Sequence, residues 1–184
     1  MNLSDREFWG IVHGMGLGAL YMLAFAGALA GLWSLRPKLL TSEGVMERMP
    51  RLKTGLTIMA VAAWLTVITG TWIVYPWYRG GATDTCTATS VEQVPPECGA
   101  KWTLVADEGT AQWHEFGMEW KEHVAWIVPL FATAVAFAVV YLGRGLLQRN
   151  DVRRNLMWFL FASFGLAAIA GLLGALITKN APVL

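Results

Sequence analysis

The sequence predicts an all-α membrane protein that folds as an up-down bundle of four transmembrane helices. The chain is 55% apolar and only 15% charged, whereas soluble domains average about 25% charged residues. Four apolar stretches, residues 8–35, 56–77, 124–142 and 156–177, each approach or exceed the roughly 20 residues that cross a hydrocarbon core of about 30 Å. We call them spans one to four. The whole chain, residues 1–184, is expected to form this one domain.

The distribution of basic residues predicts how the bundle is oriented in the membrane. Segments 36–53 and 144–154, which link spans one and two and spans three and four, hold nine of the fourteen basic residues. Basic residues in short loops stay on the cytoplasmic side. We therefore expect a multi-pass protein of the bacterial inner (plasma) membrane, with both termini and residues 78–122 outside. A net charge of only +1 gives no indication of nucleic-acid binding.

Residues 78–122 are expected to form an ordered but irregular cap on the outer side. The segment contains several turn-forming glycines and prolines, and its only cysteines are Cys86 and Cys98. Neither belongs to a Cys-x-x-Cys motif, so in an oxidising compartment a disulfide between them is the default. In the chain-entropy model a loop of this length stabilises the fold by about 3 kcal/mol.

Two histidines, His13 and His123, are the main candidates for function. Ionisable groups at membrane depth are costly and therefore mark functional sites. His13 is the only ionisable residue inside the four stretches, and His123 immediately precedes span three. Helical rise places them at depths that differ by about 4 Å. In an up-down bundle spans one and three lie diagonally opposite each other, so the two imidazoles are expected near the same end of the bundle.

Glycines surround His13 in span one. Gly10, Gly14 and Gly18 form a small-xxx-small ladder, which allows another helix to approach closely or a flat cofactor to lie against the backbone. Both interpretations remain open on the sequence alone. The position of His13 inside the ladder favours the cofactor.

Paired imidazoles across the centre of a bundle suit the axial coordination of haem iron. The arrangement resembles the haem-binding bundle of membrane b-type cytochromes; the resemblance is architectural, covers the four spans and rests on no sequence motif. It implies one haem b held by His13 and His123, with Gly14 and Gly18 making room. Each imidazole would donate its other N–H to a carbonyl, hydroxyl or carboxylate, Glu119 being a candidate. The large quinol-oxidising cytochromes b carry two histidines on each ligand helix, and this chain lacks the inner pair.

A rival site is the run from Trp113 to His123, which is expected to be helical and to continue into span three. On an α-helix Glu115, Glu119 and His123 share one face, and His114, Met118 and Glu122 share a neighbouring one. Carboxylates and imidazoles of this kind bind non-haem metals in bundles. The candidate metal ligands are therefore His13 and His123, or alternatively His114, Glu115, Glu119 and Glu122. A surface turn in which Lys121 balances part of the acidic charge explains the same pattern.

Two further residue types bear on the site. Pro129 lacks an N–H and is expected to bend span three near Ala125, whose carbonyl loses its helical partner. Thr66, Thr69 and Thr71 could hydrogen-bond a cofactor, although such hydroxyls more often bond to their own helix.

Three functions from different classes remain open. The first is an electron-transfer subunit with one haem near the outer face, inside a larger respiratory or photosynthetic complex. Its partners would be other membrane subunits, lipid, and a quinone or soluble cytochrome. The second is a cofactor-free accessory or assembly subunit whose cap docks a catalytic partner. The third is a membrane metalloenzyme that uses residues 114–123, so whether the chain is an enzyme stays open.

Overall fold

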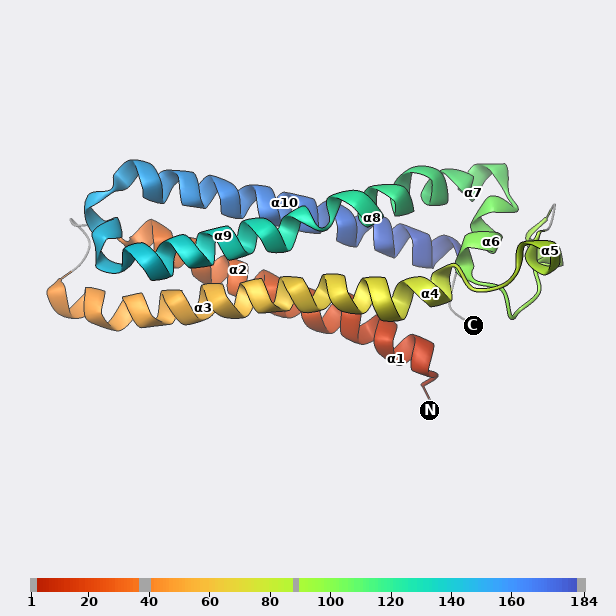
Figure 1. Cartoon of the computed structure of the whole chain (residues 1–184), viewed down its shortest axis with the longest axis horizontal. Coiled ribbons are helices and arrows are strands. Elements are labelled where there is room, and N and C mark those ends of the chain that lie inside the picture. Colours follow the sequence, from red (N-terminus) through yellow and green to blue (C-terminus); the bar gives the residue numbers. More distant parts are fainter. Residues whose placement is uncertain (1–2, 37–40, 88–89, 182–184) are drawn as a thin grey trace.

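The computed structural model describes residues 3–36, 41–87 and 90–181 (Figure 1). These residues form helices and connecting turns without β-strands. Among them, four helices are long and apolar enough to cross a membrane: Asp5–Ser34, Ser42–Tyr78, Glu108–Gln148 and Asn150–Asn180. Each contains one of the four predicted apolar stretches almost entirely and extends beyond it. The prediction of an all-α fold with four helices long and apolar enough to cross a membrane is confirmed, and it is consistent with a multi-pass membrane protein.

Spans one and two each contain a wider, π-helical turn between regular helices. Span one consists of α1 (Asp5–Ile11), η1 (Val12–Gly16) and α2 (Leu17–Ser34). Span two consists of α3 (Ser42–Thr69), η3 (Gly70–Val74) and α4 (Tyr75–Tyr78). Ser4 and Thr41 cap the two N-termini by accepting hydrogen bonds from backbone N–H groups of the first turn.

Span three is the most interrupted of the four. It runs through α7 (Glu108–Gln112), the π-helical η5 (Trp113–Met118), α8 (Glu119–Val124), α9 (Ile127–Leu142) and the 3₁₀ turn η6 (Gly143–Gln148). Span four is one continuous helix, α10 (Asn150–Asn180). The helical run from Trp113 into span three is therefore confirmed, but with a π turn at its start.

The spans form a four-membered ring in which sequence neighbours are also neighbours in space. Helix α2 packs on α3, α3 on α9, α9 on α10, and α10 on α2. Spans one and three thus lie diagonally, as expected. Residues 3–5, 78–87, 90–108 and 178–181 lie at one end, here called the cap end, and residues 41–53 and 144–154 of the two basic links lie at or near the other, the basic end (Figure 1).

The interruption between α8 and α9 has the expected cause. Because Pro129 has no N–H, the Ala125 carbonyl cannot accept the usual helical bond. It accepts one from the Val128 N–H instead, at 3.2 Å. Regular helix therefore stops at Val124 and resumes at Ile127.

Tight packing begins near the middle of the bundle and continues to the basic end. Its fully buried members come from all four spans and include Leu32, Leu56, Met59, Val139 and Leu160. At its cap-end limit the Tyr21 hydroxyl lies 2.7 Å from Ser163 Oγ, which donates to the Val128 carbonyl at 3.0 Å. This buried chain of hydrogen bonds joins spans one, four and three.

The cap is a set of short helices closed by a disulfide. It contains α5 (Thr83–Cys86), η4 (Val91–Gln93) and α6 (Ala100–Val105). Cys86 and Cys98 are bonded, with an S–S distance of 2.00 Å, so the predicted pairing is confirmed. A small second core, built on Tyr78, Leu104, Met118 and Ile177, attaches the cap to the bundle.

Gly99 is placed where no side chain fits. Its N–H donates to the Gly80 carbonyl at 2.8 Å, and a Cβ at position 99 would lie 2.4 Å from the Tyr78 carbonyl oxygen. We expect Gly99→Ala to lower stability by roughly 1–3 kcal/mol, measured as a lower unfolding temperature in detergent. Gly80→Ala is the control, because its Cβ would meet only ordinary contacts at 3.4 Å or more. Equal effects of both variants would contradict the prediction.

Candidate functional site

Three π-helical turns lie in the cap-end half of the bundle and define the candidate site. Segment η1 contains His13, η3 begins at Gly70, and η5 contains His114. The π-helix is rare, and it occurs most often as a single bulge at a functional site. These three are the π-helical segments of the described residues, and each contains at least one glycine. This half of the molecule also holds all three histidines.

His13 is anchored against span two. Its Nδ1 lies 3.2 Å from Thr69 Oγ1, and that hydroxyl donates to the Leu65 carbonyl at 2.8 Å. Thr69 therefore accepts from His13, which places the proton on Nδ1 and the lone pair on Nε2. The ring packs directly over Gly70, where a Cβ would lie 2.7 Å from His13 Cε1.

His123 is anchored by its own helix. Its Nδ1 donates to the Glu119 carbonyl at 2.8 Å, and the Glu119 carboxylate lies 3.8 Å away. Its side chain is 74% exposed, and Nε2 is the nitrogen that this hydrogen bond leaves unused. Both rings thus make the second-nitrogen hydrogen bond expected of metal-ligating histidines.

The structure does not bring His13 and His123 face to face. The Lys121 side chain points to α10, where its Nζ lies 2.8 Å from the position that a Cβ on Gly174 would take. Side chains two residues apart on a helix project to nearly opposite sides. His123 therefore lies on the side of α8 opposite Lys121, with an exposed side chain, and ligation of one iron by both histidines stays a prediction.

Lys121 is the functional candidate that the sequence reasoning missed. One explanation of the acidic run was that Lys121 balances part of its charge, but Arg79 pairs with the acidic residues instead, at 3.6 Å from Glu119 and 3.4 Å from Glu122. In the part of the chain that the structure describes, the ammonium of the half-buried Lys121 makes no hydrogen bond or ion pair. Its place in the sequence, two residues after Glu119 and two before His123, already puts it on the opposite side of the helix.

Spans one and four separate towards the cap end. They are joined by the stacked rings of Phe25 and Phe164, whose centroids are 4.4 Å apart. Seven residues closer to the cap end, on the same helix faces, lie Gly18 and Gly171. Open space surrounds the position of a Cβ on either glycine, and also on Gly14. We call the region of Gly14, Gly18 and Gly171 the glycine gap; among the described residues, the ladder is not used for close helix packing.

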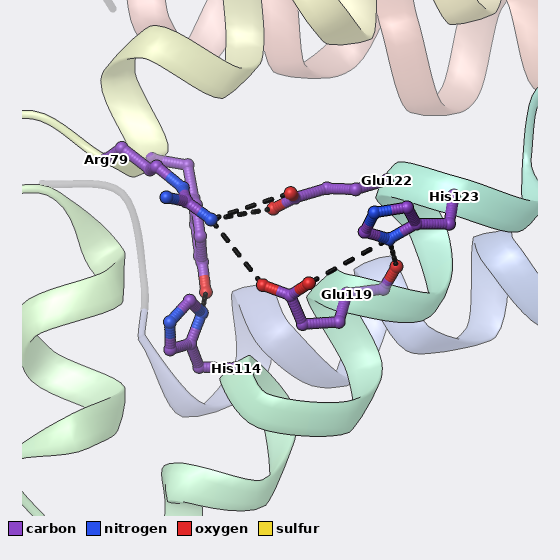
Figure 2. A network of polar contacts seen from close by, with 6 residues as sticks. Arg79, His114, Glu119, Glu122 and His123 are labelled. Atoms are coloured by element: carbon purple, nitrogen blue, oxygen red, sulfur yellow. Dashed lines mark hydrogen bonds and ion pairs between the residues drawn. The ribbon is translucent and has the colours of Figure 1, made fainter.

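The rival metal site is dispersed. Figure 2 shows the Glu119 and Glu122 carboxylates directed to Arg79, while His114 lies apart from them. His114 Nδ1 shares a 2.8 Å hydrogen bond with the Tyr78 hydroxyl, and Glu115 is exposed. The π turn η5 shifts residues 113–118 out of α-helical register with Glu119. No group of three or more His, Cys, Asp or Glu side chains among the described residues could hold a metal ion.

The threonines of span two behave as hydroxyls in helices commonly do. Thr66 and Thr69 donate to the carbonyls of Ala62 and Leu65, each at 2.8 Å. Of these two hydroxyls, only that of Thr69 also contacts His13. Its donation to its own helix is what leaves its oxygen free to accept.

No family model matches this chain, no curated protein matches it, and no solved structure matches it.

The tautomer of His13 can be tested directly. In Thr69→Val the acceptor for Nδ1–H is lost, so the proton is expected to redistribute between Nδ1 and Nε2. Imidazole ¹⁵N chemical shifts of His13 in detergent report this redistribution. Thr66→Val is the matched control, because it removes only the hydroxyl that bonds to Ala62 and keeps the Thr66 carbonyl, which accepts from Thr69 at 3.1 Å. An unchanged His13 spectrum in Thr69→Val would show that Thr69 does not set the tautomer.

Proposed function

We propose that this protein is an integral membrane electron-transfer subunit that binds one b-type haem in the cap-end half of its bundle, with His13 as an axial ligand. The observation that carries the proposal is the fixed ring orientation and tautomer of His13. Thr69 and Gly70 fix its ring, and Nε2, the nitrogen that binds haem iron, carries the lone pair. Such a fixed tautomer is typical of a metal-ligating histidine.

The surroundings of His13 suit a flat, anionic cofactor. The glycine gap offers helix backbone without side chains, against which a porphyrin edge can lie. Lys121 supplies an ammonium with no partner among the described residues, which suits a haem propionate. Haem bound there would supply one-electron transfer, and the residues would orient it and limit the access of water.

His123 remains the candidate for the second axial position. It comes from span three, diagonal to His13, and its hydrogen bond to Glu119 leaves Nε2 unused. Joint ligation requires the cap-end part of span three to turn, because His123 lies on the side of α8 opposite Lys121. The interruption at residues 125–126 is a place where such a turn would cost few hydrogen bonds.

The proposal includes an orientation and a class of partner. The basic links favour a cytoplasmic basic end and an outer, periplasmic cap end in a bacterial inner membrane. A haem near the cap end would then exchange electrons with a soluble cytochrome, or with a quinol that arrives laterally, inside a larger redox complex. The missing inner pair of histidines favours one haem rather than two.

The haem is tested by the visible spectrum of the purified protein. We expect sharp bands in the dithionite-reduced state and one haem per chain by pyridine haemochrome assay. His13→Ala should abolish haem retention, and Thr69→Val should weaken haem binding by roughly 10-fold or more. His123→Ala should also lose haem if the second ligand is His123.

His114→Ala is the matched control, because His114 bonds to Tyr78 rather than facing the glycine gap. It should keep the reduced spectrum. A native protein expressed under haem-replete conditions without any haem, or an unchanged spectrum in His13→Ala, would overturn the proposal in favour of a cofactor-free accessory subunit.

The orientation is tested by labelling single cysteines in intact cells. Ser42 lies exposed at the basic end and Gln112 lies exposed near the cap, while both native cysteines are disulfide-bonded. An impermeant maleimide should label Gln112→Cys from outside and should label Ser42→Cys only after the membrane is opened. The reverse pattern would contradict the proposed orientation.

A further inference from the structure

We propose that the basic end of the bundle holds a specific binding site for an anionic phospholipid, in a groove between spans one and two. The groove is a cavity of about 420 Å³. It lies in the opposite half of the molecule from His13, so the inference does not depend on the proposed haem.

The walls of the groove are apolar and built from small residues. Gly27, Ala28 and Gly31 line it on span one, and Gly55 and Ile58 line it on span two. The two spans meet at Gly31, where a Cβ would lie 2.8 Å from Leu52 Cδ1. At Gly27 and Gly55 the Cβ positions face open space, so the helices leave room there for a narrow hydrocarbon chain.

The length of the groove matches one leaflet of a bilayer. At the rise of an α-helix its lining covers about 21 Å on span one, from Leu20 to Ser34, and about 15 Å on span two, from Arg48 to Ile58. The wall on span two sets the length over which both helices line the groove. That length is half of a hydrocarbon core of about 30 Å. An acyl chain in the groove would thus end near the bilayer midplane.

The mouth of the groove is cationic. Arg48, Arg51 and Ser34 line it at the basic end, where phospholipid headgroups lie. Arg51 pairs with Glu47 at 2.6 Å, but both side chains are mostly exposed, and exposed pairs contribute little. The Arg48 guanidinium has no hydrogen bond or ion pair within the described residues. Guanidinium groups bind phosphate in a bidentate manner, so the mouth suits a lipid phosphate.

These features together identify the occupant. A neutral detergent would use the apolar groove but not the two guanidinium groups. A soluble phosphate would use the guanidinium groups but not the groove. A lipid with a net negative headgroup, such as phosphatidylglycerol, uses both.

Native mass spectrometry of delipidated protein provides the test. The protein is titrated with phosphatidylglycerol and with phosphatidylcholine of the same acyl chains, and apparent affinities are compared. We expect tighter binding of phosphatidylglycerol by wild type. The double variant Arg48→Gln/Arg51→Gln should lose roughly 30-fold in that affinity. The control Arg149→Gln/Arg154→Gln removes two exposed basic residues from the other link and should lose little.

A second pair of variants tests the groove. Gly27→Leu places a side chain in it whose Cβ meets no atom within 4 Å, and Gly165→Leu is the control on α10, where the Cβ is equally free of contacts. Gly27→Leu should weaken phosphatidylglycerol binding, and Gly165→Leu should not; helix content by circular dichroism checks the fold. Equal losses in both arginine doubles, full binding by Gly27→Leu, or displacement of the lipid by glycerol phosphate would each overturn the proposal.

Discussion

The hydrogen-bonded chain from Tyr21 through Ser163 to the Val128 carbonyl is the constraint on which the bundle depends. Ser163 is completely buried, and an unsatisfied polar group at membrane depth costs several kcal/mol. The three groups satisfy one another and so fix spans one, three and four at one level. Below that level the core is close-packed to the basic end. Above it spans one and four diverge, which exposes the glycine gap beside His13.

Charge is organised differently in the two halves. At the cap end, Arg79 neutralises Glu119 and Glu122 and leaves Lys121 unpaired within the described residues. An ammonium in this position lowers the cost of bringing an anion into the bundle. At the basic end, the arginines flank an apolar groove. Both ends therefore combine a cation with an open glycine-rich surface, and each suits an amphiphilic ligand with a negative group.

The lengths of the apolar stretches were enough to predict the four spans and, for an up-down bundle, the diagonal relation of spans one and three. The interruption at Pro129 could be predicted because a missing N–H is a local property of the chain. The Cys86–Cys98 bond followed from composition and spacing. Side-chain directions near His13, Gly70 and His114 were harder, because each π turn adds a residue to the helical repeat. An α-helical projection then misplaces Glu115 relative to Glu119. Lys121 was missed because Glu119 and Glu122 lie within two residues of it in the sequence, although they lie on other faces of the helix.

The contact between Gly70 and His13 has a consequence for the evolution of the chain. The imidazole occupies the volume that any side chain at position 70 would need, so position 70 cannot take a larger residue unless position 13 takes a smaller one. Among relatives of this protein the two positions are therefore expected to covary: a larger residue in span two would accompany a smaller one in span one. A sequence collection deep enough to measure that coupling would locate the packing of the two spans without any structure.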